Sequence, residues 1–188
     1  MRTQQTHTWS HLKPRLKDLE KDQLLLLLHD LYDLNADNRL YLSTRLLADT
    51  SEEMVAPYRR IIKQVFNPDR GVPSLKLSAA RKALNDFKKA CADTPAVIDL
   101  MLFYVEEAIT CTNTYGDMRD VSFYQSLVSV YSNAADLTYK IDDPALTIAL
   151  HPRFKELLDD STDLGWNVYD ELINIYLNAF PPGEDEWP

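Results

Sequence analysis

Apolar side chains recur at steps of three and four residues along most of the chain, which is the spacing of amphipathic α-helices. The clearest stripe consists of Leu77, Ala80, Leu84, Phe87 and Cys91. We find no convincing run of alternating apolar and polar residues, the pattern of a half-exposed strand. The chain has only four glycines, which suits helices joined by Asn, Asp, Ser and Pro. The sequence therefore predicts an all-α protein.

About nine helices are expected from these stripes and from the residues that cap or interrupt them. We expect them over residues 10–19, 22–34, 40–47, 54–66, 78–91, 94–115, 123–141, 152–160 and 163–180. Ser78 is expected to open the fifth helix. The pair Thr94-Pro95 is expected to open the sixth, because proline suits the first helical turn. Pro144 and Pro152 are expected to mark a break before the eighth.

The second of these helices is apolar on more than one side. One face consists of Leu24, Leu27, Leu28, Leu31 and Leu34, and further leucines lie beside it. A helix of this kind is usually packed between neighbours.

Short, numerous and broadly apolar helices favour a stack of helical hairpins, with an irregular helical bundle as the alternative. The segment 128–133 also resembles the segment 173–178 at an offset of 45 residues. Helical-hairpin repeats have offsets of about 40–47 residues.

The length of 188 residues suits one medium domain. We expect a disordered N-terminus over 1–9, a single all-helical domain over 10–180, and an acidic disordered tail over 181–188. The polar start resembles no secretory signal, and the apolar runs at 24–28 and 100–105 are too short to span a bilayer.

The two cysteines, Cys91 and Cys111, form no metal-binding or redox motif. We interpret them as reduced thiols of the core in a cytoplasmic protein.

Charge is distributed unevenly along the chain. The whole protein carries a net charge of −9, whereas residues 59–89 contain nine basic and two acidic residues, and residues 92–188 carry a net −14. This asymmetry predicts either a binding surface or an electrostatic match between two halves of the fold.

The best candidate site lies in the basic stretch, where a loop leads into a helix start. Arg81 and Lys82 fall in the first helical turn, where cations oppose the helix dipole and an anion would compensate them. The candidate anion-binding residues are Arg70, Lys76, Ser78, Arg81, Lys82, Lys88 and Lys89. The anion could be phosphate, a nucleic-acid backbone or an acidic protein segment. Alternatively, the acidic half neutralises this surface within the fold.

Few other residues suggest chemistry. Asp99, Glu106 and Glu107 could serve acid–base or metal chemistry, but a polar helix face is the simpler interpretation. Histidines occur at 7, 11, 29 and 151 only, and the common nucleotide, hydrolase and zinc motifs are missing from the sequence. We therefore predict no catalytic residue, no metal site and no cofactor, and an enzyme is the less favoured interpretation.

Three segments of the chain together resemble a known protein family. They are DLYDLN at 30–35 within the leucine-rich region 24–47, the basic helix at 75–89, and DLMLFYVE at 99–106 followed by TNTYGD at 112–117. Over roughly residues 12–180 the chain resembles an uncharacterised family of small bacterial all-helical proteins, a domain of unknown function. The resemblance implies a bacterial, cytosolic, all-helical protein and no particular activity.

We therefore expect a non-catalytic helical scaffold or protein-interaction module. Its partner would be another protein or a second copy of itself. The alternative is binding of an anion or a nucleic-acid backbone through residues 59–89. We expect no membrane association.

Overall fold

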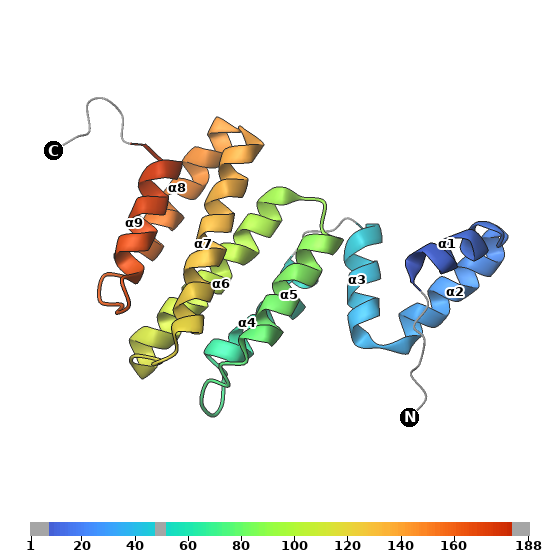
Figure 1. Ribbon diagram of the computed structural model, residues 1–188, viewed down its shortest axis with the longest axis horizontal. Coiled ribbons are helices and arrows are strands. Elements are labelled where there is room, and N and C mark those ends of the chain that lie inside the picture. Colours follow the sequence, from blue (N-terminus) through green and yellow to red (C-terminus); the bar gives the residue numbers. More distant parts are fainter. Residues whose placement is uncertain (1–7, 48–51, 182–188) are drawn as a thin grey trace. The chain divides into compact units, whose positions relative to one another are not determined.

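The computed structural model describes residues 8–47 and 52–181, and these residues contain nine α-helices and no strand (Figure 1). The all-α prediction is therefore confirmed. The helices are α1 (Trp9–Lys17), α2 (Lys21–Leu34), α3 (Ala36–Leu47), α4 (Glu52–Phe66), α5 (Leu77–Ala90), α6 (Thr94–Tyr115), α7 (Val121–Ile141), α8 (Pro144–Asp159) and α9 (Val168–Ala179).

The chain divides into two compact units, unit 1 over residues 1–43 and unit 2 over residues 44–188. We describe each by itself, and the single domain expected over 10–180 stays a prediction. The expected disorder at the two ends falls mostly outside the described residues. Within the described part of those segments, Trp9 is already the first residue of α1.

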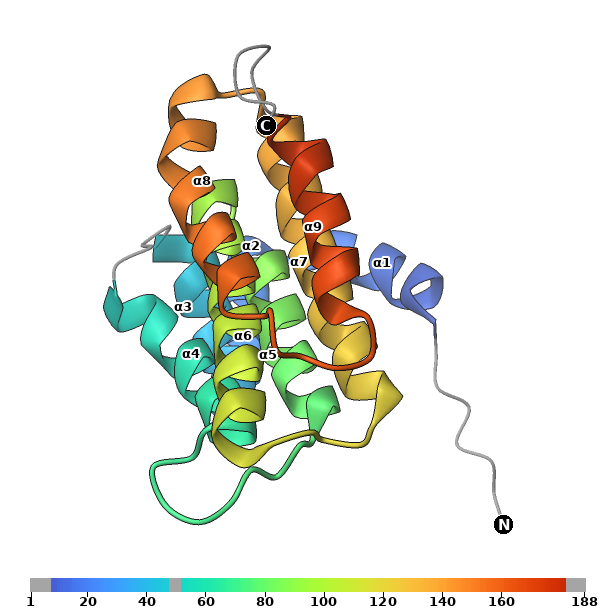
Figure 2. The same ribbon diagram turned by 90° about the vertical axis from the view of Figure 1, so that its left-hand side faces the viewer.

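Unit 2 is a stack of three helical hairpins, formed by α4 with α5, α6 with α7, and α8 with α9 (Figure 1). The first helices of successive hairpins pack on each other, α4 on α6 and α6 on α8, while α7 packs on α9. Figure 2 shows these two layers from the end of the stack. Of the two expected architectures, unit 2 has the hairpin stack.

The core of unit 2 is rich in fully buried aromatic rings. Phe66 meets the rings of Tyr104 and Phe123 edge to face at centroid distances of 5.0 and 5.8 Å. The Tyr104 hydroxyl lies 2.6 Å from the Ser126 hydroxyl, so this buried polar group has a hydrogen-bond partner. Burial raises the pKa of Tyr104. These contacts join α4, α6 and α7 into one packed centre.

Two helix starts differ from the prediction. Helix α8 begins at Pro144 rather than at Pro152. The Asp143 carboxylate caps this start by accepting hydrogen bonds from the N–H groups of Ala145 and Leu146. Pro152 lies inside this helix. Because proline has no N–H, the carbonyl of Ile148, four residues earlier, lacks its helical hydrogen bond. Ile148 is exposed, so water can solvate this carbonyl.

Helix α9 begins at Val168 rather than near Asp163. Trp166 and Asn167 have left-handed backbone conformations, with φ of 63° and 58°. A right-handed helix does not pass through residues in this conformation, so the helical pattern of the sequence does not continue through them.

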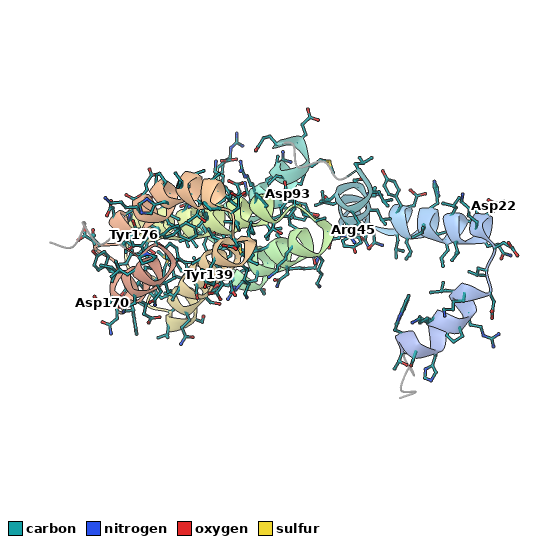
Figure 3. All side chains as sticks on the ribbon, turned by 90° about the horizontal axis from the view of Figure 1, so that it is seen from above. Asp22, Arg45, Asp93, Tyr139, Asp170 and Tyr176 are labelled. Carbon is teal, nitrogen blue, oxygen red and sulfur yellow. The ribbon has the colours of Figure 1, made fainter. Side chains whose placement is uncertain are left out.

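Unit 1 has a different character. None of the described residues of unit 1, 8–43, is buried, and helices α1, α2 and α3 share few contacts. Figure 3 draws all side chains, and in unit 2 they fill the spaces between the helices. Across the described chain, no helix is both long enough and apolar enough to cross a membrane.

Candidate interaction surfaces

The basic residues of α5 lie on its solvent side because the helix is strongly amphipathic. Its apolar stripe, which includes Ala80, Leu84 and Phe87, is buried. Lys82 and Lys89 are exposed on the opposite side, seven residues and therefore two turns apart. The polar stripe that carries them was foreseeable from the sequence.

Arg70 and Lys76 lie on the loop that joins α4 to α5, and both are exposed. The loop is tied to the end of α4, because the N–H groups of Ser74 and Leu75 donate to the Val65 carbonyl at 3.1 and 3.3 Å. These bonds hold the loop beside the first turn of α5.

Ser78 does not open the helix, contrary to expectation. Helix α5 begins at Leu77, and Lys76 occupies the N-cap position without a side-chain cap hydrogen bond. The left-handed Leu75, with φ of 51°, precedes this start. Ser78 is therefore already inside the first turn, on its exposed side.

Most of the predicted anion-binding residues keep their charge available. Lys82 pairs with Asp86 at 2.7 Å along the same helix. Among the described residues, no ion pair forms at the others, which are Arg70, Lys76, Arg81, Lys88 and Lys89. The five positive charges lie along one loop and one helix.

In the described chain, acidic residues of α6 reach the basic stretch on and just after α4, at Arg59 and at Asn67. Asp99 on α6 binds two arginines, Arg59 on α4 at 2.5 Å and Arg153 on α8 at 2.5 Å. Arg59 also pairs with Glu52 at 2.8 Å and lies over the Phe103 ring. This network ties α4, α6 and α8 together and leaves the solvent side of α5 uncovered.

The two other candidate carboxylates of α6 have structural partners as well. Glu106 lies 3.4 Å from Arg153, and Glu107 accepts a hydrogen bond of 2.7 Å from the Asn67 amide. Burial raises the pKa of Glu107. Within the described residues, no group of three or more His, Cys, Asp or Glu side chains is placed to hold a metal ion.

The leucines of α2 are not packed between neighbours within unit 1, contrary to expectation. Leu26 is 67% exposed and Leu34 is 71% exposed. Leu25, Leu27, Leu28 and Leu31 are exposed too. Helix α2 itself is well formed, with a reciprocal cap in which the Glu20 N–H donates to Gln23. A regular apolar helix with no buried side chain is an unpartnered surface.

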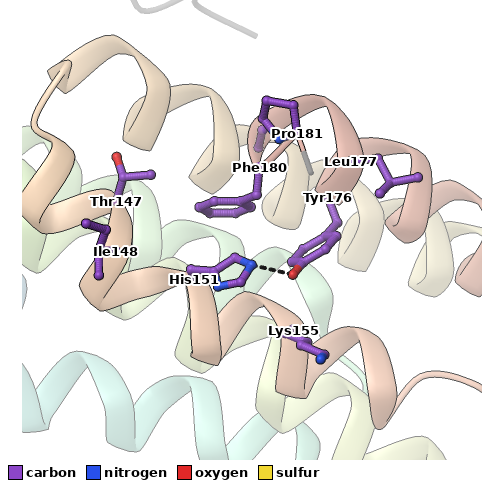
Figure 4. A pocket seen from close by; sticks show the side chains of 9 residues that line it. Thr147, Ile148, His151, Lys155, Tyr176, Leu177, Phe180 and Pro181 are labelled. Carbon is purple, nitrogen blue, oxygen red and sulfur yellow. Dashed lines mark hydrogen bonds between the residues drawn. The ribbon is translucent and has the colours of Figure 1, made fainter. Parts of the chain in front are cut away.

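Sequence reasoning missed a hollow between α8 and α9. It has a volume of about 730 Å³, and its lining includes His151 on α8, Tyr176 on α9 and Phe180 just after α9 (Figure 4). His151 Nε2 lies 2.5 Å from the Tyr176 hydroxyl, and their rings stack. The one signal in the sequence was the likeness of 128–133 to 173–178, in which Tyr131 and Tyr176 occupy the same position.

The family comparison covers almost the whole chain. The model of a family described as a family of unknown function (DUF6155) matches residues 8–180. No curated protein and no solved structure matches the chain.

Proposed function

Since the chain belongs to this family of unknown function, whose description names no activity, we propose from its surfaces that the protein is a non-catalytic interaction module. Its leucine-rich helix α2 would bind a protein partner or a second copy. The observation that carries the proposal is that the leucines of α2 are unburied among the described residues of unit 1.

Leaving these leucine side chains in water has a free-energy cost. Burying one leucine side chain contributes about 1.5–3 kcal/mol. A helix as short as the 14 residues of α2 is marginal in water without packing of its apolar face. A surface that covered α2 would therefore stabilise the helix and gain binding energy from the same contacts.

The spacing of the leucines fits a helix that lies in a groove. Leu24, Leu27, Leu28, Leu31 and Leu34 follow steps of three and four residues along α2. Helices that bind in hydrophobic grooves use anchors at this spacing. Polar and acidic residues flank the stripe, among them Asp30 and the pair of His29 and Asp33, which lie 3.4 Å apart.

The direct test replaces two anchors with charges. We expect the wild-type chain to form a complex through α2, either with a second copy or with a protein recovered from its own cells, and L28E/L31E to lose this α2-dependent complex. The matched control is L46E/L47E, which places the same two charges on exposed leucines of α3. Light scattering after size exclusion gives the mass, and quantitative mass spectrometry compares the recovered proteins. Equal mass and equal recovery for wild type and L28E/L31E would refute the role of α2.

Binding of anions or nucleic acids is the second candidate function. It is supported by the exposure of Arg70, Lys76, Lys88 and Lys89 and by their lack of ion pairs among the described residues. The partner would be a phosphate backbone, because surface lysines and arginines bind it through charge without reading sequence.

Fluorescence anisotropy with labelled RNA and DNA oligomers tests this second function. We expect binding that weakens steeply with salt, because cations on the protein displace counterions from the phosphates. R81E/K82E is expected to abolish the binding while the chain stays folded. Equal binding by wild type and R81E/K82E would contradict this function.

A cytoplasmic, reducing location and a bacterial source complete the proposal. Cys91 and Cys111 are free thiols in the structure, and Cys111 is buried. Free thiols are usual in reducing compartments, which supports the location. The resemblance of the sequence to a family of bacterial proteins supports the source.

A further inference from the structure

The outer side of the last hairpin carries apolar side chains that face solvent. The hollow between α8 and α9 is lined by Ile148, His151 and Lys155 from α8, by Tyr176 from α9, and by Phe180, the residue that follows α9 (Figure 4). Ile148 is 73% exposed. We call this surface, formed by these five residues and Thr147, Leu177 and Asp143, the α8–α9 face.

A second, smaller hollow adjoins the first. It has a volume of about 250 Å³ and lies beside the end of α7, where its lining includes Tyr139 and Asp143. Thr147 and Ile148 line both hollows. Ile148 therefore lies between the two hollows. In a pair of molecules, the Ile148 side chain of one copy can enter a hollow of the other.

The hairpin repeat indicates what such a face normally contacts. Tyr131 on α7 and Tyr176 on α9 occupy the same position in the two similar segments, 128–133 and 173–178. Tyr131 is fully buried, and its hydroxyl donates to the Phe154 carbonyl on α8, the first helix of the next hairpin. Tyr176 is only half-buried, and no helix of the described chain follows α9. The α8–α9 face is thus where a further layer would pack.

Helix α8 has a second side that fits packing. Its inner side is buried through Phe154, Leu157 and Leu158. Its outer side presents Thr147, Ile148, His151 and Lys155 at steps of three and four residues. Terminal repeats of helical stacks usually present a polar outer surface, so an outer side with Ile148 exposed indicates an occupant.

The outer side of α8 carries two opposite charges that would pair with those of a second copy of α8 lying antiparallel to it. Asp143 caps the start of α8, and Lys155 lies twelve residues on, about 18 Å along the axis. Asp143 uses Oδ1 to cap the helix, and neither its Oδ2 nor Lys155 has a partner among the described residues. An antiparallel copy of α8 would bring each of these charges opposite its counterion.

We propose that the α8–α9 face pairs with the same face of a second copy about a twofold axis. The axis passes near Ala149, midway between Asp143 and Lys155 and next to Ile148, so that Ile148 enters the hollow beside His151 of the partner subunit. Asp143 then meets Lys155 of the partner subunit, and the reverse pair forms at the other end. A twofold interface uses the same patch on both copies and closes at the dimer.

The first experiment measures mass by sedimentation over a range of micromolar concentrations. It uses the full chain carrying L28E/L31E, so that association through α2 cannot contribute. We expect a dimer, and we expect I148E to weaken it at least about tenfold, since buried apolar anchors dominate such interfaces. The matched control is V72E, because Val72 is 77% exposed on the loop before α5. V72E should leave the dimer unchanged.

The second experiment tests the charge pairs by mixing two variants. K155E alone places two carboxylates opposite each other, and D143K alone places two ammonium groups opposite each other, so each variant should be monomeric. An equal mixture restores both ion pairs and should form a heterodimer. Merely structural damage at either position would not be repaired by mixing, and circular dichroism checks that both variants keep their helices.

Three results would overturn the proposal: a monomer in the L28E/L31E chain, a dimer that I148E leaves intact, or open polymers in place of a closed dimer. A mixture of K155E and D143K that stays monomeric would overturn the assignment of the charge pairs. These results are independent of the proposed function of α2, because that function fails only when L28E/L31E itself leaves complex formation unchanged.

Discussion

Helices α2 and α6 have similar apolar character but opposite surroundings. Helix α6 has eleven buried residues among its 22, whereas α2 has none among its 14. The difference lies in what surrounds them, because α6 packs against α4, α5, α7 and α8. Apolar residues on several sides of a helix indicate that it needs neighbours, and they do not indicate whether those neighbours belong to the same chain.

Hydrogen exchange gives the largest expected difference between the two helices. Amides in the middle of α6 should exchange only through global unfolding, and amides of α2 through local opening, so their protection should differ by several orders of magnitude. Mass spectrometry of the exchanged protein at low concentration measures both. Strong protection of α2 in the monomer would contradict the comparison, because it would mean that α2 is already packed.

A core truncation in α6 should be the most damaging single substitution. Leu102 is fully buried, and Leu102→Ala is expected to lower the free energy of unfolding by about 2–5 kcal/mol, since it removes apolar contacts and leaves a cavity. Urea denaturation measures the change. A loss below about 1 kcal/mol would mean that the packing around α6 is loose.

The buried thiol of α6 should make stability fall at alkaline pH. Burial raises the pKa of Cys111 to about 11 from a model-compound value of 9.0. Between these pH values the unfolded chain loses the thiol proton more readily than the folded chain, so the free energy of unfolding decreases as pH rises from 9 to 11. Cys111→Ala should flatten this part of the pH profile. An unchanged slope in this variant would mean that other groups cause it.

The ion pairs of Asp99 should contribute less than the apolar core. Asp99→Asn weakens the bonds to Arg59 and Arg153 and leaves two half-buried cations without their shared counterion. We expect a loss of about 1–2 kcal/mol at low salt, because the carboxylate is about a third exposed and solvent screens the pairs. Thermal unfolding at two salt concentrations measures it. A loss that does not shrink with salt would contradict the electrostatic explanation.

The smallest effect is expected on α2. Leu26→Ala should change the free energy of unfolding of the monomer by no more than about 0.5 kcal/mol, because exposed positions away from special features tolerate substitution. The comparison with Leu102→Ala removes the same atoms from both helices. A loss close to that of Leu102→Ala would show that the two regions are equally packed.

Local patterns were enough to predict most of the secondary structure. The stripe at Leu77, Ala80, Leu84 and Phe87 gave α5 its correct buried side, because helical periodicity depends on neighbouring residues alone. The pattern placed Cys91 in the core as well, but Cys91 is half-buried at the C-cap. An apolar pattern in the sequence can continue beyond the residue at which the helix ends, as it does at Cys91 after α5.

The candidate surfaces depended on contacts that a sequence pattern does not contain. The basic residues were foreseeable, but the pairing of Asp99 with Arg59 and Arg153, which are 40 and 54 residues away, was not. The hollow beside His151 depends on Tyr176, 25 residues away on another helix. Tertiary packing decides both, so periodicity and composition could not predict them.

The hairpin order of unit 2 also governs how it would respond to tension. Each hairpin packs mainly on the one before and the one after it, so the stack behaves as a one-dimensional array. A force applied between residues 52 and 181 would load the terminal hairpins first, and the chain would lengthen in steps as α8 and α9 peel from α6 and α7. The unit would then act as an extensible tether whose length depends on how many hairpins are still folded.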